Sequence, residues 1–275
     1  MKNEGQIKET VKQKYSEIAL GRNTNQGCCE GVCCTSATYT IQSEDYSQLE
    51  GYNTNADMGL GCGLPTKYAG IKKGDTVVDL GSGAGNDCFV ALAETGETGK
   101  VVGIDFSEAM INKARENTDK VGYTNISFKQ GDIENMPLDE NFADVIVSNC
   151  VLNLLPSKDK IFHEIFRVLK PNGHFCISDV VLTGKLPRTI KNAVEMYVGC
   201  ISGAVQKEQY ITKISDAGFL HVKIAKETPI IIPDEVLGKY LKTNKLEKFK
   251  EENPIVSITV TGIKPKSCCC KPGCC

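Results

Sequence analysis

The chain has 275 residues and a formal net charge of −2, and its hydrophobic content of 41% is normal for a globular protein. The length suits one α/β domain with an appendage or two small domains, and the lack of a basic stripe argues against a nucleic-acid-binding protein. No apolar stretch is long enough to span a membrane and the polar N-terminus has no signal-peptide core, so we expect a cytoplasmic protein without nucleic-acid or membrane partners.

The first predicted elements in the chain are a helical arm and a cover segment. The spacing of Val11, Tyr15 and Ile18 predicts an amphipathic helix over residues 8–20. Residues 21–70 are rich in Gly, Asn, Thr and Cys, and we interpret them as loops and short helices that cover a site. Residues 1–64 therefore form an N-terminal arm and cover.

From residue 74 to residue 181, apolar runs alternate with helical stretches. The alternation predicts a mostly parallel sheet with right-handed crossovers. The predicted helices span 107–117 and 158–170, and the second ends at Lys170-Pro171-Asn172-Gly173. The predicted strands are 76–80, 100–105, 126–130, 143–149 and 174–181.

The rest of the chain adds helices, strands and a tail. Residues 184–218 are mostly helical in pattern, and 221–227 and 257–263 predict two late strands at the sheet edge. We expect a core over 65–183, a region of helices and edge strands over 184–263, and a tail over 264–275.

The first strand runs into a glycine-rich turn, VVDLGSGAGND, and then into a helix. Gly81 and Gly83 let the backbone approach a ligand closely, although Asn86 replaces the last glycine of the dinucleotide fingerprint. Asp79 would be costly to bury without a cationic partner, which a ligand with an ammonium group supplies. The turn alone is weak evidence, because any tight strand–helix connection favours glycine.

Acidic residues follow the next two strands. Asp105 ends strand 100–105, where an acid reaches ribose hydroxyls in nucleotide-binding sheets. Asp132 and Ile133 follow strand 126–130 and would flank an adenine. A single acid is usually a solvated loop residue, but three acids at successive strand ends predict a nucleoside site.

These segments, together with GIDFSEAM, GDIENMPL and ADVIVSN, resemble the class I S-adenosylmethionine-dependent methyltransferases over about residues 65–183. The resemblance implies a Rossmann-like α/β fold with a mostly parallel seven-stranded sheet flanked by helices, and S-adenosyl-L-methionine as the cofactor. The cofactor-binding residues that it implies are Asp79, Gly81, Ser82, Gly83, Asp105, Phe106, Met110, Asp132, Ile133 and Asn149.

Fourteen cysteines favour metal binding or redox chemistry over a static disulfide framework in a reducing compartment. Three single ones have distinctive contexts: Cys62 in GLGCG, Cys150 in SNCVLNL at a strand end, and Cys200 in VGCISGA. Free cysteine is often a small buried hydrophobe, and we assign that role to Cys88 and Cys176.

The three contexts closely resemble the arsenite methyltransferases, the arsenic(III)-methylating branch of this superfamily, over about residues 55–225. The resemblance implies that Cys62, Cys150 and Cys200 are catalytic and bind arsenic(III), supplied as arsenite or its thiol conjugates. Thiolates suit this soft metalloid, and its free lone pair needs no general base to attack a sulfonium methyl group. The expected function is arsenic detoxification by methylation, with catalysis resting on positioning.

The remaining cysteines lie in two clusters, at 28–34 and 268–275. The resemblance places in the first cluster a redox partner for Cys62, since methylation oxidises arsenic and a closing dithiol returns two electrons. The expected reductant that reopens the dithiol is of glutathione or thioredoxin type. A zinc or heavy-metal clip is the alternative, and the tail either delivers the metalloid or binds any soft ion. The relay candidates are Cys28, Cys29, Cys33 and Cys34.

Two other functions stay open. One is a small-molecule C- or O-methyltransferase with incidental cysteines, which would need a base or an apolar pocket. The other is a thiol-rich metal-binding or sequestration protein on a methyltransferase scaffold. Release of S-adenosylhomocysteine on addition of arsenite separates methylation from binding alone.

Overall fold

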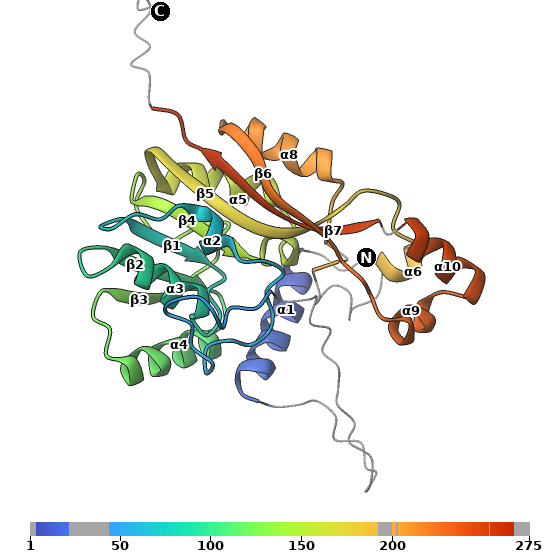
Figure 1. Ribbon diagram of the computed structural model, residues 1–275, viewed down its shortest axis with the longest axis horizontal. Coiled ribbons are helices and arrows are strands. Elements are labelled where there is room, and N and C mark those ends of the chain that lie inside the picture. The colour runs from blue at the N-terminus through green and yellow to red at the C-terminus, as the bar shows by residue number, and fades with distance from the viewer. Residues whose placement is uncertain (1–3, 22–43, 192–199, 202, 253, 267–275) are drawn as a thin grey trace, which may run out of the picture.

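The computed structural model describes residues 4–21, 44–191, 200–201, 203–252 and 254–266. Its core is a seven-stranded sheet with the order β3-β2-β1-β4-β5-β7-β6 (Figure 1). The first five strands run parallel and the last two pair antiparallel, which confirms the predicted mostly parallel α/β fold. The strands are β1 (Thr76–Leu80), β2 (Lys100–Asp105), β3 (Ile126–Gln130), β4 (Ala143–Asn149), β5 (Leu169–Leu182), β6 (Leu220–Pro229) and β7 (Ile255–Ile263).

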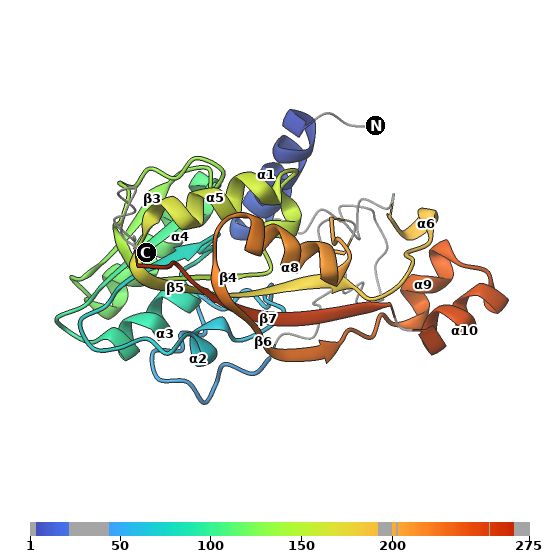
Figure 2. The same ribbon diagram turned by 90° about the horizontal axis from the view of Figure 1, so that it is seen from above.

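Helices cover both faces of the sheet. Helices α5 and α8 pack on one face, and α2 and α3 lie on the other (Figure 2). The described helices are α1 (Glu4–Ala19), α2 (Pro65–Ala69), α3 (Asn86–Thr95), α4 (Glu108–Val121), the 3₁₀ helix η1 (Leu152–Leu154), α5 (Lys158–Val168), α6 (Arg188–Lys191), α8 (Lys207–Asp216), α9 (Asp234–Tyr240) and α10 (Thr243–Glu252).

The strand order creates a crevice in the middle of the sheet. Strand β1 lies between β2 and β4, so the chain leaves β1 toward one side and later returns to its other side. At such a switch point the connections diverge above the carboxyl ends of the strands, and ligands bind there. Strands β1 and β4 are buried on both faces, which explains their nearly continuous apolar sequences.

The late strands differ from the prediction in one respect. Strand β6 forms the edge as expected, but the edge position predicted for 257–263 is wrong, because β7 lies between β5 and β6. The first six residues of β7 are all buried, whereas β6 carries the exposed residues Lys223 and Glu227, which suit an edge.

The predicted end of the second core helix is also wrong in position. Helix α5 ends at Val168, and the segment Lys170-Pro171-Asn172-Gly173 belongs to β5. The backbone N–H of Asn172 donates to Lys264 O at 2.9 Å, and that of Lys264 donates to Gly173 O at 2.8 Å. The segment around Asn172 and Gly173 therefore joins the sheet through its backbone hydrogen bonds with Lys264, which follows β7.

The N-terminal helix and the late helices surround one end of the sheet. Helix α1 confirms the helix predicted over residues 8–20 and begins at Glu4, and its Val11 is fully buried. Helices α6, α9 and α10 lie together on the right in Figure 1, away from α1. Residues of α1, α6, α9 and α10 share one apolar cluster with Cys62, Cys150 and Cys200. Among the described helices, none combines the length and the apolarity that crossing a bilayer requires.

Candidate active site

A pocket lies over the carboxyl ends of β1, β2 and β4. Each of these strands contributes the residues that directly follow it, and α1 and the segment 46–61 close the sides. The residues predicted from sequence that line it are Gly81, Ser82, Gly83, Asp105, Phe106, Asn149 and Cys150. The lining side chains that sequence analysis did not find include Tyr15, Tyr46, Asp57, Met58 and Asp87.

The glycine turn forms the floor of the pocket. Gly81 has a φ of 69°, and a Cβ there would overlap the Val151 side chain, so only glycine fits. The Ser82 hydroxyl is buried and has no hydrogen-bond partner among the described residues. A buried polar group without a partner is costly. The turn therefore fits a ligand that brings its own polar group to Ser82.

Asp105 occupies the end of β2, as the sequence predicts. Its carboxylate accepts hydrogen bonds from the backbone N–H groups of Gly83 at 3.0 Å and Ser107 at 2.8 Å. Burial raises its pKa to about 6, although these hydrogen bonds oppose the rise. The carboxylate is thus held rigidly at the pocket wall, where it would bind hydroxyl groups of a ligand.

Two further carboxylates lie side by side beneath the pocket. Asp79 is buried behind the turn, accepts a hydrogen bond from the Cys88 thiol at 3.2 Å, and does not line the pocket. Asp87, in the first turn of α3, does line it. Burial, and then mutual repulsion, raises the pKa of Asp79, and burial raises that of Asp87 to about 6. Neither has an ion-pair partner among the described residues, so the pair would stabilise a cationic ligand.

Asn149 links the pocket to the segment that carries Cys62. Its side-chain amide donates to Gly63 O at 2.8 Å and to Asp87 at 3.2 Å, and its Oδ1 accepts from the Cys62 N–H at 3.0 Å. The Tyr46 hydroxyl donates to Asp87 at 2.8 Å and lies 2.6 Å from the Asn149 amide nitrogen. One amide therefore fixes both the pocket wall and the position of the first thiol.

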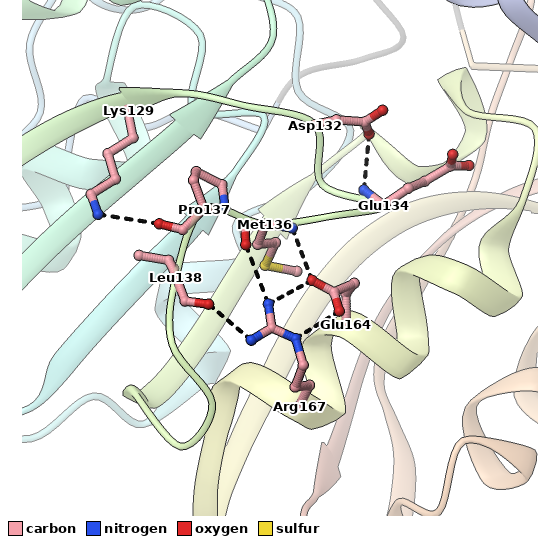
Figure 3. A network of polar contacts seen from close by, with 8 residues as sticks. All are labelled: Lys129, Asp132, Glu134, Met136, Pro137, Leu138, Glu164 and Arg167. Carbon is pink, nitrogen blue, oxygen red and sulfur yellow. Dashed lines mark hydrogen bonds and ion pairs between the residues drawn. The ribbon is translucent and has the colours of Figure 1, made fainter.

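Asp132 and Ile133, which are predicted to flank an adenine, lie outside the pocket lining, as does the predicted cofactor-binding residue Met110. Ile133 and Met110 are buried, and Asp132 forms an ion pair with Lys8 of α1 at 2.6 Å. Lys8 also reaches Glu134, so α1 is tied down beside the connection after β3. Glu164 and Arg167 of α5 fix the backbone of the same connection, at Met136 and Leu138 (Figure 3).

The three thiols with distinctive contexts meet beside the pocket. Cys62, Cys150 and Cys200 are each no more than 3% exposed, and the Cys200 thiol donates to Cys150 O at 2.7 Å. The Cys150 thiol interacts with the thiols of Cys200 and Cys62, with which it shares one apolar cluster. We call these three residues the thiol cluster. Cys150 alone belongs both to the cluster and to the pocket lining.

Backbone strain marks two members of the thiol cluster. Cys150 has a φ of 61° and Cys200 a φ of 64°. Both lie in the left-handed region, which residues other than Gly, Asn and Asp rarely adopt. Such conformations persist only where the surrounding structure enforces them, and they concentrate at functional sites. The positive φ values of Cys150 and Cys200 are therefore consistent with a functional role for both residues.

Two thiols of the cluster, those of Cys150 and Cys200, are held in the protonated form. Hydrogen bonds to the other two thiols, followed by burial, raise the pKa of Cys150 well above its usual value. The hydrogen bond with Cys150 lowers the pKa of Cys200, but burial together with electrostatic interactions with Asp179 and Cys62 outweighs it, and the net shift is upward. No group of three or more His, Cys, Asp and Glu side chains in the described residues is arranged to hold a metal ion.

The other cysteines divide into two groups. Cys88 and Cys176 are fully buried in the apolar layer between the sheet and α3, which confirms their assignment to the core. The relay candidates of the 28–34 cluster and the cysteines of the 268–275 cluster lie outside the described residues.

Comparisons with known proteins point in one direction. A family model described as a methyltransferase domain matches residues 71–218. The chain is 37% identical to an arsenite methyltransferase of Halobacterium salinarum, over 89% of the chain and 67% of the relative. It is 34% identical to an arsenite methyltransferase of Aquipseudomonas alcaligenes, over 85% of the chain and 68% of the relative.

Solved structures agree with these matches. An arsenic(III) S-adenosylmethionine methyltransferase from Chlamydomonas reinhardtii superposes with a TM-score of 0.62 at 31% identity, over 78% of this chain and 68% of that one. The chain thus spans about two thirds of the length of these relatives. On the family model and the extent of these matches together, the chain belongs to the arsenite methyltransferase family of S-adenosylmethionine-dependent methyltransferases.

Proposed function

We propose that the protein transfers methyl groups from S-adenosylmethionine to arsenic(III) held by Cys62, Cys150 and Cys200. The observation that carries the proposal is the double role of Cys150, which lines the pocket and contacts both other thiols. An atom bound to the thiol cluster would lie next to a ligand on the glycine turn. Such proximity converts an encounter in solution into a reaction within one site.

The pocket residues fit the cofactor that the family uses. The unpartnered Ser82 hydroxyl and Asp87 would bind the polar, charged methionine end, and Asp105 would bind the ribose hydroxyls. When bound, S-adenosylmethionine supplies an electrophilic methyl group that the arsenic lone pair takes up, as S-adenosylhomocysteine leaves with the electron pair of the broken sulfur–carbon bond. Asp132 and Ile133 stay proposed neighbours of the adenine.

Capture of arsenite by the thiol cluster is balanced in protons. Three thiols replace the three hydroxides of As(OH)₃, and each thiol proton leaves with a hydroxide as water. The raised pKa values of Cys150 and Cys200 keep both groups in the thiol form that this exchange consumes at neutral pH. The protein therefore binds a neutral substrate without creating charge in its apolar interior.

The methyl transfer itself needs no proton acceptor from the protein. Arsenic attacks with a lone pair and carries no proton, and none of the three histidines of the chain lines the pocket. Apolar side chains such as Val11, Leu154 and Val180 surround the thiols and exclude water. The work of the protein is to position and desolvate the two reactants.

Repeated turnover requires electrons, because the transfer raises arsenic formally from the trivalent to the pentavalent state. We propose that Cys62 and one of Cys28, Cys29, Cys33 and Cys34 close to a disulfide and supply two electrons, and that a thiol of glutathione or thioredoxin type reopens it.

The test combines the protein with arsenite, S-adenosylmethionine and glutathione, and follows S-adenosylhomocysteine together with methylated arsenic. We expect one S-adenosylhomocysteine for each methyl group found on arsenic, and Cys150→Ser to form neither product. Arsenic uptake without S-adenosylhomocysteine would instead show a sequestration protein. Turnover of an organic acceptor by Cys150→Ser would show a different methyltransferase.

A further inference from the structure

A buried ammonium group lies behind the third thiol. Lys158, the first residue of α5, is only 6% exposed, and its Nζ donates to Gly203 O at 2.9 Å. Burying a lysine is expensive, and in this protein burial lowers the pKa of Lys158. Asp179, fully buried on β5, opposes that effect electrostatically and accepts a hydrogen bond from Tyr210 at 3.2 Å. Such a buried group needs a structural reason.

The reason lies in the turn that Lys158 contacts. Gly203 follows Cys200 by three residues and packs directly on η1, where a Cβ on Gly203 would overlap the carbonyl oxygen of Asn153. Because η1 begins two residues after Cys150, this packing brings the Cys200 turn onto the segment that carries the second thiol. The ammonium group of Lys158, on α5, holds Gly203 through its hydrogen bond to Gly203 O.

Few other polar contacts hold the Cys200 turn in the described residues. The Cys200 thiol donates to Cys150 O, and beyond the turn the Leu182 N–H donates to Val205 O at 2.9 Å. Arsenic would remove the first of these contacts, since the donated proton leaves as water when the sulfur binds. The left-handed backbone of Cys200 would then depend on its remaining tethers.

We propose that Lys158 is a positioning residue that holds the Cys200 turn in place, so that the third sulfur stays on arsenic after its own hydrogen bond is lost. The proposal rests on the function given above and deepens it. It predicts that loss of the ammonium group changes how many sulfur atoms bind arsenic, and leaves the cofactor pocket unchanged, because Lys158 does not line that pocket.

The experiment compares the full-length wild type with Lys158→Met, Lys158→Gln and Lys158→Arg. The sulfur coordination number of bound arsenic is measured by X-ray absorption, the KM for arsenite by kinetics and S-adenosylmethionine affinity by calorimetry. We expect the coordination to fall from three sulfurs to two and the KM to rise about tenfold or more in Lys158→Met, with cofactor affinity within about twofold of wild type. Lys158→Arg keeps a donor and should keep most of the third contact.

The matched control is Lys213→Met, which removes an ammonium group of α8 that pairs with Asp159 of α5 at the surface. It should behave as wild type. Should Lys158→Met not fold, Lys158→Gln decides, because its amide stands on a shorter stem and has no charge. Three sulfurs and an unchanged KM in whichever of these variants folds would overturn the role of Lys158. Absence of sulfur-bound arsenic in the wild type would instead overturn the proposed function.

Discussion

At the residue scale, Asp105 provides a direct test of the cofactor site. Its carboxylate stands rigidly at the pocket wall, held by two backbone N–H groups. We expect Asp105→Ala to lose about 1.5–3 kcal/mol of cofactor binding free energy, because a charged hydrogen-bond acceptor is removed. Calorimetric titration measures the loss, with Asp139→Ala, an exposed aspartate of the connection after β3, as control. Affinity within twofold of wild type would reject the assignment.

The thiol cluster is tested by exchange of sulfur for oxygen. We expect Cys150→Ser and Cys200→Ser each to abolish arsenite methylation while cofactor affinity stays near that of wild type, because oxygen is too hard a ligand for trivalent arsenic. Cys176→Ala is the control, since Cys176 is equally buried but lies in the core between the sheet and α3. Full turnover by either serine variant would show that the replaced cysteine is a core residue, like Cys176, and does not bind arsenic.

The site residues that could be predicted from sequence are those with a recognisable local sequence. The three cysteines of the thiol cluster stand in recognisable local sequences, although Cys62 and Cys200 are 138 positions apart. Tyr46, Asp87 and Lys158 stand in ordinary ones, and their roles arise only from contacts across the fold, such as that between Tyr46 and Gly63 O. Asp87 had one visible signal, an acid in the first turn of the helix after the glycine turn.

At the element scale, the segment 44–64 and the end of β4 act as one unit through Tyr46 and Asn149. We expect Tyr46→Phe to weaken both arsenite capture and cofactor binding, since the hydroxyl contacts Gly63, Asp87 and Asn149 together. Each lost hydrogen bond is worth about 1 kcal/mol, and more where a partner is left buried and unpaired. Separate titrations of the two ligands measure the effect. Tyr123→Phe, at a partly exposed tyrosine, should change neither.

The predictability of the elements follows their apolar content. Strands β1, β2 and β4 are mostly apolar runs, β3 has Ile126 and Phe128 at alternate positions, and the bounds predicted from sequence for all four are the observed ones. Helices α9 and α10 between the late strands were not predicted. The sequence of α10, TNKLEKFKEE, offers only Leu246 and Phe249 as apolar contacts. Such a helix forms by packing onto the cluster around the thiols rather than by its own pattern.

At the scale of the whole molecule, turnover joins the active site to a segment outside the described residues. Changing Cys28, Cys29, Cys33 and Cys34 together to serine should limit the protein to one methylation cycle, since no dithiol then returns two electrons. Product per enzyme is followed over time with a thioredoxin-type reductant. The matched variant carries serine at all five cysteines of the 268–275 cluster and should turn over repeatedly. Sustained turnover by the first variant would assign the electron supply elsewhere.

The buried carboxyl groups make the whole molecule sensitive to pH. Burial raises the pKa values of Asp87 and Asp105 from 3.8 to about 6. Between pH 4 and pH 6 the folded state thus binds protons that the unfolded state has released. This contribution to stability is complete below about pH 4 and is lost as the pH rises through about 6. A cationic ligand beside Asp87 favours its deprotonated carboxylate, so the bound protein no longer prefers the protonated form of this group.

Cofactor affinity should therefore rise with pH through about 6 and level off above it, because the deprotonated Asp87 attracts the positively charged methionine end of S-adenosylmethionine. In Asp87→Asn the affinity should be weaker and its pH dependence flatter, with only the titration of Asp105 remaining. Calorimetry at several pH values, in two buffers of different ionisation enthalpy, gives both the affinity and the protons released on binding. Equal proton release by wild type and Asp87→Asn at pH 6 would show that Asp87 does not face the positive charge of the cofactor.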